Sequence, residues 1–91
     1  MRKSDLVEAV AHAADLSSRQ ADDAVSAIFD HITNALARKD SVNLVGFGSF
    51  ITRERAARQG RNPQTGAAIN IAASVLPAFK PGKKLKDALV D

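Results

Sequence analysis

Cysteine, tryptophan and tyrosine are all absent from this 91-residue chain, which also has only three prolines and four phenylalanines. Without cysteine the chain can form neither a disulfide framework nor a thiolate metal site, and its composition fits a reducing compartment. No apolar run approaches the roughly 18 residues of a membrane span. The basic N-terminus, MRKSDLVEAV, lacks the long apolar stretch of a secretion signal. We therefore expect a soluble, cytoplasmic protein without a membrane partner.

The residue patterns of catalysis, cofactor binding and metal binding are missing as well. The two histidines, His12 and His31, have no ligand partners at metal-binding spacing. The stretch GFGSFI has Ile51 where a dinucleotide-binding loop needs its third glycine. GRNPQTG is not followed by the Lys-Thr pair of a Walker-type phosphate loop. No nucleophile elbow is visible. We therefore expect no enzyme, no cofactor and no metal site.

Apolar residues at helical spacing predict two helices in residues 1–40. The first carries Leu6, Val7 and Val10 on one face, with Ser4 or Asp5 as its expected cap. A second helix restarts after Ser17, which has the spacing of a capping box with Gln20. Its apolar stripe comprises Ala21, Ala24, Val25, Ile28, Phe29, Ile32, Ala35 and Leu36.

After residue 40 the pattern changes to strands. SVNLVGFGSFITRE combines β-branched and aromatic residues around Gly46 and Gly48, which predicts a tight turn between two antiparallel strands. We expect the second strand to continue through RERAAR and to pair with AAINIAASV, with Asn62, Pro63 and Gly66 forming the connecting turn. The final stretch, KPGKKLKDALV, predicts a break and a short basic helix.

A hairpin of this length does not fit inside a compact domain of this size. The 12 residues from Phe50 to Arg61 would span about 40 Å as a strand. A compact chain of this length has a radius of gyration of only about 12 Å. We therefore expect an arm that projects into solvent. The remaining core is small, so we expect Phe29, Phe47, Phe50 and Phe79 to pack across a twofold axis between two chains.

Charge is distributed unevenly along the chain. Residues 1–45 carry five basic and seven acidic side chains, a net of −2, whereas residues 46–91 carry eight basic and three acidic ones, a net of +5. Four arginines lie within nine residues of the predicted arm, and Arg53, Arg55 and Arg61 share one strand face. Guanidinium groups suit phosphate contacts and insertion into a narrow groove. This pattern predicts nucleic acid as the partner, with the Pro63 ring placed to enter a base step.

The stretches GFGSF, RERAARQGRNPQTG and PAFKPGKKLKDAL resemble the HU and integration host factor family of bacterial histone-like DNA-bending proteins, and HU more closely. The resemblance covers essentially the whole chain. It implies an α+β fold with an N-terminal helical hairpin, a three-stranded antiparallel sheet, a long protruding β-ribbon arm, a short C-terminal helix and an intertwined dimer. The expected single domain divides into a helical dimerisation base (1–40), a sheet (41–52), a DNA-binding arm (53–76) and a C-terminal strand end and helix (77–91).

The resemblance also implies an architectural double-stranded DNA-binding protein, largely sequence-independent, that bends and compacts the bacterial chromosome in the nucleoid. Pro63 would be the intercalating wedge on each arm. The other implied DNA-binding residues are Lys3, Arg53, Arg55, Arg58, Arg61, Asn62, Lys80, Lys83 and Lys86, and Phe47, Phe50 and Phe79 match the family's dimer core. Two positions depart from the family pattern, because Gln59 and Ser18 stand where basic residues are frequent. Asp15 occupies a common glycine position.

Several alternatives stay open at this point. Within the same fold, the chain could be a site-specific DNA bender like integration host factor. In a different class, it could be a dimerisation module for proteins whose basic face binds an acidic partner. A homodimer and a heterodimer with a paralogue are both compatible with the sequence, as are intact, nicked or junction DNA and RNA as ligands.

Overall fold

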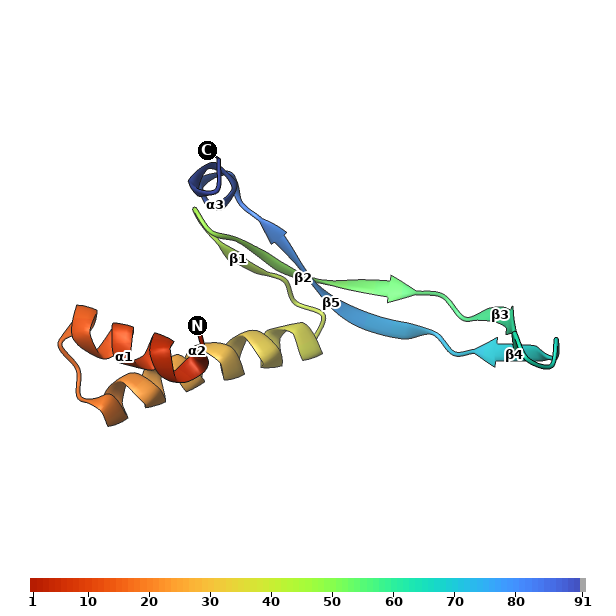
Figure 1. Cartoon of the computed structure of the whole chain (residues 1–91), viewed down its shortest axis with the longest axis horizontal. Helices are drawn as coiled ribbons and strands as arrows, with labels where there is room; N and C mark the ends of the chain where they lie inside the picture. Colours follow the sequence, from red (N-terminus) through yellow and green to blue (C-terminus); the bar gives the residue numbers. More distant parts are fainter. Residues whose placement is uncertain (91) are drawn as a thin grey trace.

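The computed structural model describes residues 1–90 as an elongated molecule with a helical layer, a small sheet and a projecting ribbon (Figure 1). Asp91, the last residue of the predicted C-terminal segment, lies outside the described residues. The elements, in chain order, are α1 (Lys3–Ala14), α2 (Ser18–Ala37), β1 (Val42–Leu44), β2 (Gly48–Arg55), β3 (Arg58–Arg61), β4 (Ala68–Ile71), β5 (Ser74–Pro81) and α3 (Lys83–Ala88). This order confirms the predicted α+β architecture.

The two N-terminal helices pack side by side as an antiparallel pair (Figure 1). The predicted capping box at the start of α2 is present. The Gln20 backbone N–H donates to Ser17 Oγ at 3.1 Å, and the Ser17 backbone N–H donates to Gln20 Oε1 at 3.0 Å. Asp15, between the helices, has a left-handed backbone with φ 55°, a conformation that Asp tolerates better than most residues.

The start of α1 differs from the prediction. The helix begins at Lys3, after Arg2, and not at a cap formed by Ser4 or Asp5. Asp5 is instead the third helical residue, where its carboxylate accepts a 2.8 Å hydrogen bond from the Arg2 backbone N–H. A carboxylate in the first helical turn still satisfies a free N–H group and interacts favourably with the helix dipole, so it stabilises the helix from this position.

Strands β1, β2 and β5 form one antiparallel sheet with β2 in the centre. A tight turn joins β1 to β2, closed by a 2.9 Å hydrogen bond from the Phe47 N–H to the Leu44 carbonyl. Gly46 occupies this turn at φ +85°, where a residue with a Cβ atom is strained. At Gly48 a Cβ atom would lie 2.6 Å from both the Lys80 carbonyl oxygen and the Phe79 ring, so only glycine lets β5 approach this closely.

The ribbon continues from β2 and β5 into β3 and β4, but it is not the unbroken pair of strands that the sequence predicts. Ladder pairing stops at Arg55 and Ser74 and resumes at Arg58 and Ile71. The alanine pairs 56–57 and 72–73 lie in this gap. Alanine contributes little cross-strand packing, which gives the ladder little support there. The offset between opposed residues is the same on both sides of the gap, so neither strand carries an inserted residue.

The folded chain has a very small core of its own. Within residues 1–90 the buried apolar residues are Ala21, Val25 and Ala35, and no large side chain is fully buried. The radius of gyration is 19.1 Å and the longest dimension is 59 Å, against about 12 Å for the radius of a compact chain of this length. The predicted projecting arm is therefore confirmed.

Among the described residues, no helix combines the length and apolarity needed to cross a bilayer.

Candidate nucleic-acid interface

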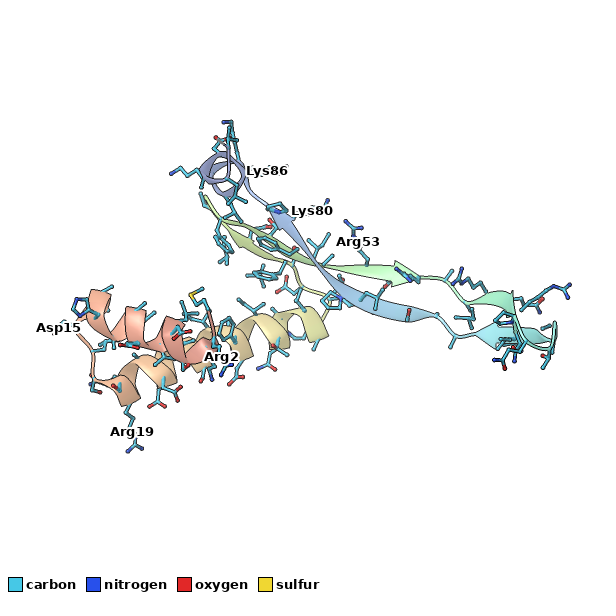
Figure 2. The ribbon with its side chains drawn as sticks, viewed as in Figure 1. Arg2, Asp15, Arg19, Arg53, Lys80 and Lys86 are labelled. Atoms are coloured by element: carbon cyan, nitrogen blue, oxygen red, sulfur yellow. The ribbon has the colours of Figure 1, made fainter. Side chains whose placement is uncertain are left out.

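The sheet presents two chemically different faces. Side chains alternate between faces along a strand, and directly opposed residues in a ladder share a face. The pairings Arg53 with Leu76 and Ser49 with Lys80 therefore place Arg53, Arg55 and Lys80 together on one face, which we call the basic face. All three side chains are exposed. Figure 2 shows Arg53 and Lys80 on the side of the sheet away from the helices.

The opposite face of the sheet is turned toward α2. Thr52, Val75 and Pro77 belong to this face, and they line a hollow together with Thr33 and Leu36 of α2. We call it the inner face. Phe50 and Phe79 lie opposite each other on it. The sheet therefore directs Phe50 and Phe79 to one side and Arg53, Arg55 and Lys80 to the other.

Glu54, the only acidic residue between positions 53 and 66, also lies on the inner face. Its carboxylate accepts a 3.0 Å hydrogen bond from Lys39 Nζ, which makes an ion pair just beyond the end of α2. Lys39 has a left-handed backbone with φ 60°, so the chain turns sharply at this point. The one acid of the arm is therefore directed away from the basic face and paired with a lysine.

The tip of the arm is organised by its own polar side chains. The Asn62 N–H donates to the Ala67 carbonyl at 2.9 Å, and the Gly66 N–H donates back to the Asn62 carbonyl at 2.8 Å. Asn62 Oδ1 accepts from the Gln64 N–H at 2.9 Å, and the Arg61 guanidinium donates to the Gly66 carbonyl at 3.2 Å. The predicted turn chemistry is confirmed, and it leaves the Pro63 ring exposed at the end of the molecule.

Further lysines follow the sheet on α3, which begins after Gly82. Lys83 forms a 2.7 Å ion pair with Asp87, one helical turn away, while both side chains remain largely exposed. Figure 2 places Lys86 near Lys80, at the end of the sheet that lies opposite the arm. Lys84, an exposed lysine on the same helix, was not among the residues predicted from the sequence. The run KPGKKLKDAL contains it, so charge alone could have identified it.

Lys3 does not join the other predicted site residues within one chain. It lies at the start of α1 on the helical layer, where its Nζ donates a 2.8 Å hydrogen bond to Ser26 Oγ of α2. The remaining predicted residues fall into three groups, and within the arm Arg58 and Arg61 project to opposite sides of the ribbon. These groups are the arm end with Arg58, Arg61, Asn62 and Pro63, the basic face with Arg53, Arg55 and Lys80, and α3 with Lys83 and Lys86.

Three phenylalanines form a cluster that the chain itself does not cover. The ring centroid of Phe79 lies 4.8 Å from that of Phe50 and 5.5 Å from that of Phe47, distances typical of packed aromatic pairs. Yet Phe47 is 47% exposed and Phe79 is 39% exposed, and Phe29 on α2 is 45% exposed. Exposed aromatic clusters of this kind mark interaction surfaces in folded proteins.

The described part of the chain shows no group of three or more histidine, aspartate or glutamate side chains arranged to hold a metal ion. Glu54 on the arm and Asp87 on α3 instead form ion pairs with lysines. The chemistry that the surface offers is therefore that of arginine and lysine: multiple N–H donors with positive charge, suited to phosphate oxygens and to acceptor groups on nucleic acid bases.

Comparison with known proteins gives consistent matches along the whole chain. A family model described as "Bacterial DNA-binding protein" matches residues 1–90. The chain is 58% identical over 89 residues to the DNA-binding protein HU of Staphylococcus aureus and to that of Geobacillus stearothermophilus, covering 98% of this chain and 99% of each relative. Its structure is similar to that of Anabaena HU in a cocrystal with DNA, with a TM-score of 0.87, 45% identity and coverage of 98% and 97% of the two chains. HU from Thermotoga maritima matches with a TM-score of 0.69 and 30% identity, over 99% of this chain and 100% of the other.

Proposed function

Because the chain belongs to the HU family of bacterial DNA-binding proteins, we propose that it is an architectural protein that binds and bends double-stranded DNA with little dependence on sequence. The family is non-enzymatic, which confirms the expectation that the chain is not an enzyme. The biological role that follows is compaction of the bacterial chromosome, with the protein in the cytoplasm and associated with the nucleoid.

The observation that carries this proposal is the projecting arm, whose root has a basic face and whose tip has an exposed proline. Arg53 and Arg55 lie on the basic face with Lys80, and the nearest acid points the other way. A two-stranded ribbon of this kind fits the minor groove, where arginine responds to the negative potential between the phosphates. The arm therefore follows the minor groove from the sheet to its tip.

Pro63 acts as a wedge at the end of the arm. Its ring is apolar, has no N–H group to leave unsatisfied, and loses almost no conformational entropy on burial. The hydrogen bonds of Asn62 and Gly66 hold the turn in shape before DNA arrives. HU is itself among the architectural proteins for which apolar wedges between base steps are established, so this role is carried over from the family.

Positive charges beyond the arm bind the DNA that the kink bends back onto the body. Lys80 on the sheet and Lys83 and Lys86 on α3 line the molecule behind the arm. Lys3 serves the same purpose from the helical layer, with its ammonium group oriented by Ser26. These contacts are to phosphates, so they position the duplex without reading its sequence.

A second copy of the chain completes the body. The exposed phenylalanines and the absence of large buried side chains in residues 1–90 leave a single chain with too little buried apolar surface for independent stability. Two chains that share a core around Phe29, Phe47, Phe50 and Phe79 bury this surface and place two arms on one duplex. The homodimer is the simplest assembly, because a twofold interface uses the same patch on both copies.

The test combines a mass measurement with competition binding. Sedimentation of the protein with a fluorescent duplex is expected to show two chains per DNA, with random duplex competing about as well as selected sequences. Strong preference for a selected sequence would indicate a site-specific bender like integration host factor. Release of the duplex by excess acidic protein would indicate the protein-binding module instead. Parallel titrations with nicked, junction and RNA duplexes establish which nucleic acid is preferred.

A further inference from the structure

One ion pair joins the helical layer to the root of the arm. Lys39 Nζ donates a 3.0 Å hydrogen bond to Glu54 Oε1. Within residues 1–90, no other side-chain hydrogen bond links the two long helices, or the loop that follows them, to the sheet. Glu54 lies one rung before the β2–β5 ladder ends at Arg55. The pair therefore holds the last part of the sheet before the outer arm begins.

The backbone at Lys39 has a conformation that favours glycine. The Lys39 N–H donates to the Leu36 carbonyl at 2.9 Å. The Asp40 N–H donates to the Ala35 carbonyl, also at 2.9 Å. These two bonds form a Schellman motif at the end of α2, and Lys39 occupies its left-handed position with φ 60°. Glycine fits this position without strain, whereas lysine does not, so what lysine adds here is a long side chain that reaches Glu54.

Packing between α2 and the arm root leaves space on both sides of the ion pair. In Figure 1 the C-terminal end of α2 lies beside the stretch where β2 and β5 pass into the arm. Two hollows of about 430 and 510 Å³ lie there, and Lys39 and Val75 line both of them. Close packing holds neighbouring elements in one geometry, and open space beside them relaxes that constraint. Apolar packing within the chain therefore does not by itself fix the inclination of the arm.

We propose that the Lys39–Glu54 pair is a strut that holds the arm at one inclination to the body and so narrows the range of angles through which bound DNA is bent. The strut rests on the proposed DNA-bending function and adds two positioning residues to it. Neither group needs to contact DNA in this role, because Glu54 lies on the inner face of the sheet and Lys39 is paired with it. The inclination of the arm sets the direction in which the duplex leaves the body.

The expected effect is modest because the pair is exposed. The Lys39 and Glu54 side chains are 60% and 67% exposed. An exposed ion pair shifts the equilibrium between two conformations by about two- to fivefold, and salt weakens it further by screening. The strut therefore biases the inclination of the arm and does not lock it.

The test measures the distribution of bend angles among single complexes of the full chain with an end-labelled duplex, by single-molecule fluorescence transfer. Glu54→Gln and Lys39→Asn each break the ion pair, and asparagine tolerates the left-handed backbone, so the turn is kept. In each variant the ratio of complexes in the main bent class to all other complexes is expected to fall by about two- to fivefold. The salt slope of binding should stay as in the wild type, because no phosphate contact is lost.

The design separates a strut from a simple effect of charge. Glu54→Gln and Lys39→Asn change the local charge in opposite directions, yet loss of the strut broadens the distribution in both. The double variant Lys39→Glu with Glu54→Lys restores an ion pair of reversed polarity, so its ratio is expected to return to within about twofold of the wild type. Arg38→Gln and Asp40→Asn are the matched controls. They change exposed charges on either side of Lys39 and should keep the wild-type distribution.

Lys39→Gly separates the strut from a contribution to stability alone. Glycine relieves the left-handed strain, so the midpoint of denaturant unfolding is expected to stay the same or rise. The distribution of bend angles should nevertheless broaden as it does in Lys39→Asn. A lower midpoint with an unchanged distribution would assign the pair to stability and overturn the strut.

Three further outcomes would overturn it. The two single variants could keep the wild-type distribution, the double variant could be as broad as the single ones, or the two control variants could broaden equally. Each of these leaves DNA binding and bending intact. Absence of bending by the wild-type chain would instead refute the proposed function, and the strut with it, so the two failures are distinguishable.

Discussion

At the scale of single residues, the surroundings of an exposed apolar ring indicate which partner it contacts. Pro63 and Phe79 are both exposed rings in one chain, but they differ in their surroundings. Phe79 lies between Phe50 and Phe47 on the inner face of the sheet, where a second surface can cover it. Pro63 stands alone at the end of the arm, with a hydrogen-bonded turn behind it. We propose that Phe79 belongs to a core shared by two chains and that Pro63 contacts DNA.

Replacing Pro63 with alanine is expected to reduce DNA bending more than DNA affinity. Opening a base step costs a few kcal/mol, and stacking of the proline ring on the open step offsets this cost. Removing the ring therefore changes affinity by less than about tenfold. Fluorescence transfer between the ends of a labelled duplex measures the bend. Gln64→Ala, at the same tip, is the matched control and should bend DNA as the wild type does. Equal bending by the Pro63 variant would refute the wedge.

Replacing Phe79 with alanine is expected to lower the free energy of unfolding by about 3–5 kcal/mol, because the proposed second copy would bury the ring. Denaturant unfolding followed by circular dichroism measures the loss. Ile69→Ala is the control, since Ile69 is 43% exposed and Phe79 39% exposed in the single chain, but Ile69 lies on the arm. Similar small losses in both variants would contradict a shared core.

At the scale of elements, local hydrogen bonding fixes where helices begin and turns close, while the ladder fixes which residues share a face. The α2 start has a complete capping box, and the arm tip has an asparagine-based turn. Between them, the ribbon keeps one register across a gap of four alanines. The elements therefore matter for function chiefly because they determine which residues lie opposite each other in the ribbon.

Replacing Ser17 with alanine is expected to cost about 1 kcal/mol of stability, because the Gln20 N–H loses its acceptor at the start of α2. The midpoint of denaturant unfolding at fixed protein concentration measures the loss. Ser18→Ala is the matched control, because Ser18 is the first helical residue and has no part in the capping box. A loss of equal size at Ser18 would contradict the capping role.

At the scale of the whole molecule, charge is separated between layers. Residues 1–45, which form the two long helices and β1, carry a net charge of −2, whereas residues 46–91 carry +5, so the positive charge is concentrated in the half that contains the arm. The elongated shape, with a longest dimension of 59 Å, spreads this charge over more length than a compact domain of the same mass could offer. Phosphate neutralisation along that length makes binding depend on salt.

The logarithm of the DNA association constant is expected to fall with the logarithm of salt concentration with a slope near −7, if each of two arms neutralises about four phosphates. Arg53→Gln removes one contact from each arm and should make the slope less steep by about 2. Arg19→Gln is the control, because Figure 2 shows Arg19 on α2, directed away from the sheet. Binding titrations over a range of salt give the slopes, and a flat response would count heavily against phosphate contacts.

Some features of this protein follow from the order of residues alone. The α2 capping box, the glycine turn between β1 and β2, the proline-tipped loop and the projection of the arm all depend on local conformational preference or on chain length, and each is present as predicted. The start of α1 was predicted at the wrong residue, because several nearby residues can cap a helix. The interruption of the ribbon was not predicted, because alanine gives no clear strand signal.

Only the tertiary structure decided which side chains act together. Strand parity from the sequence placed Arg53, Arg55 and Arg61 on one side, but only the ladder pairing between residues far apart in the chain adds Lys80 to Arg53 and Arg55. Likewise the orientation of Glu54 toward Lys39 depends on which face of the sheet packs against α2. Local sequence sets conformations over a few residues, whereas the composition of a surface is set by register and packing, which are properties of the folded chain.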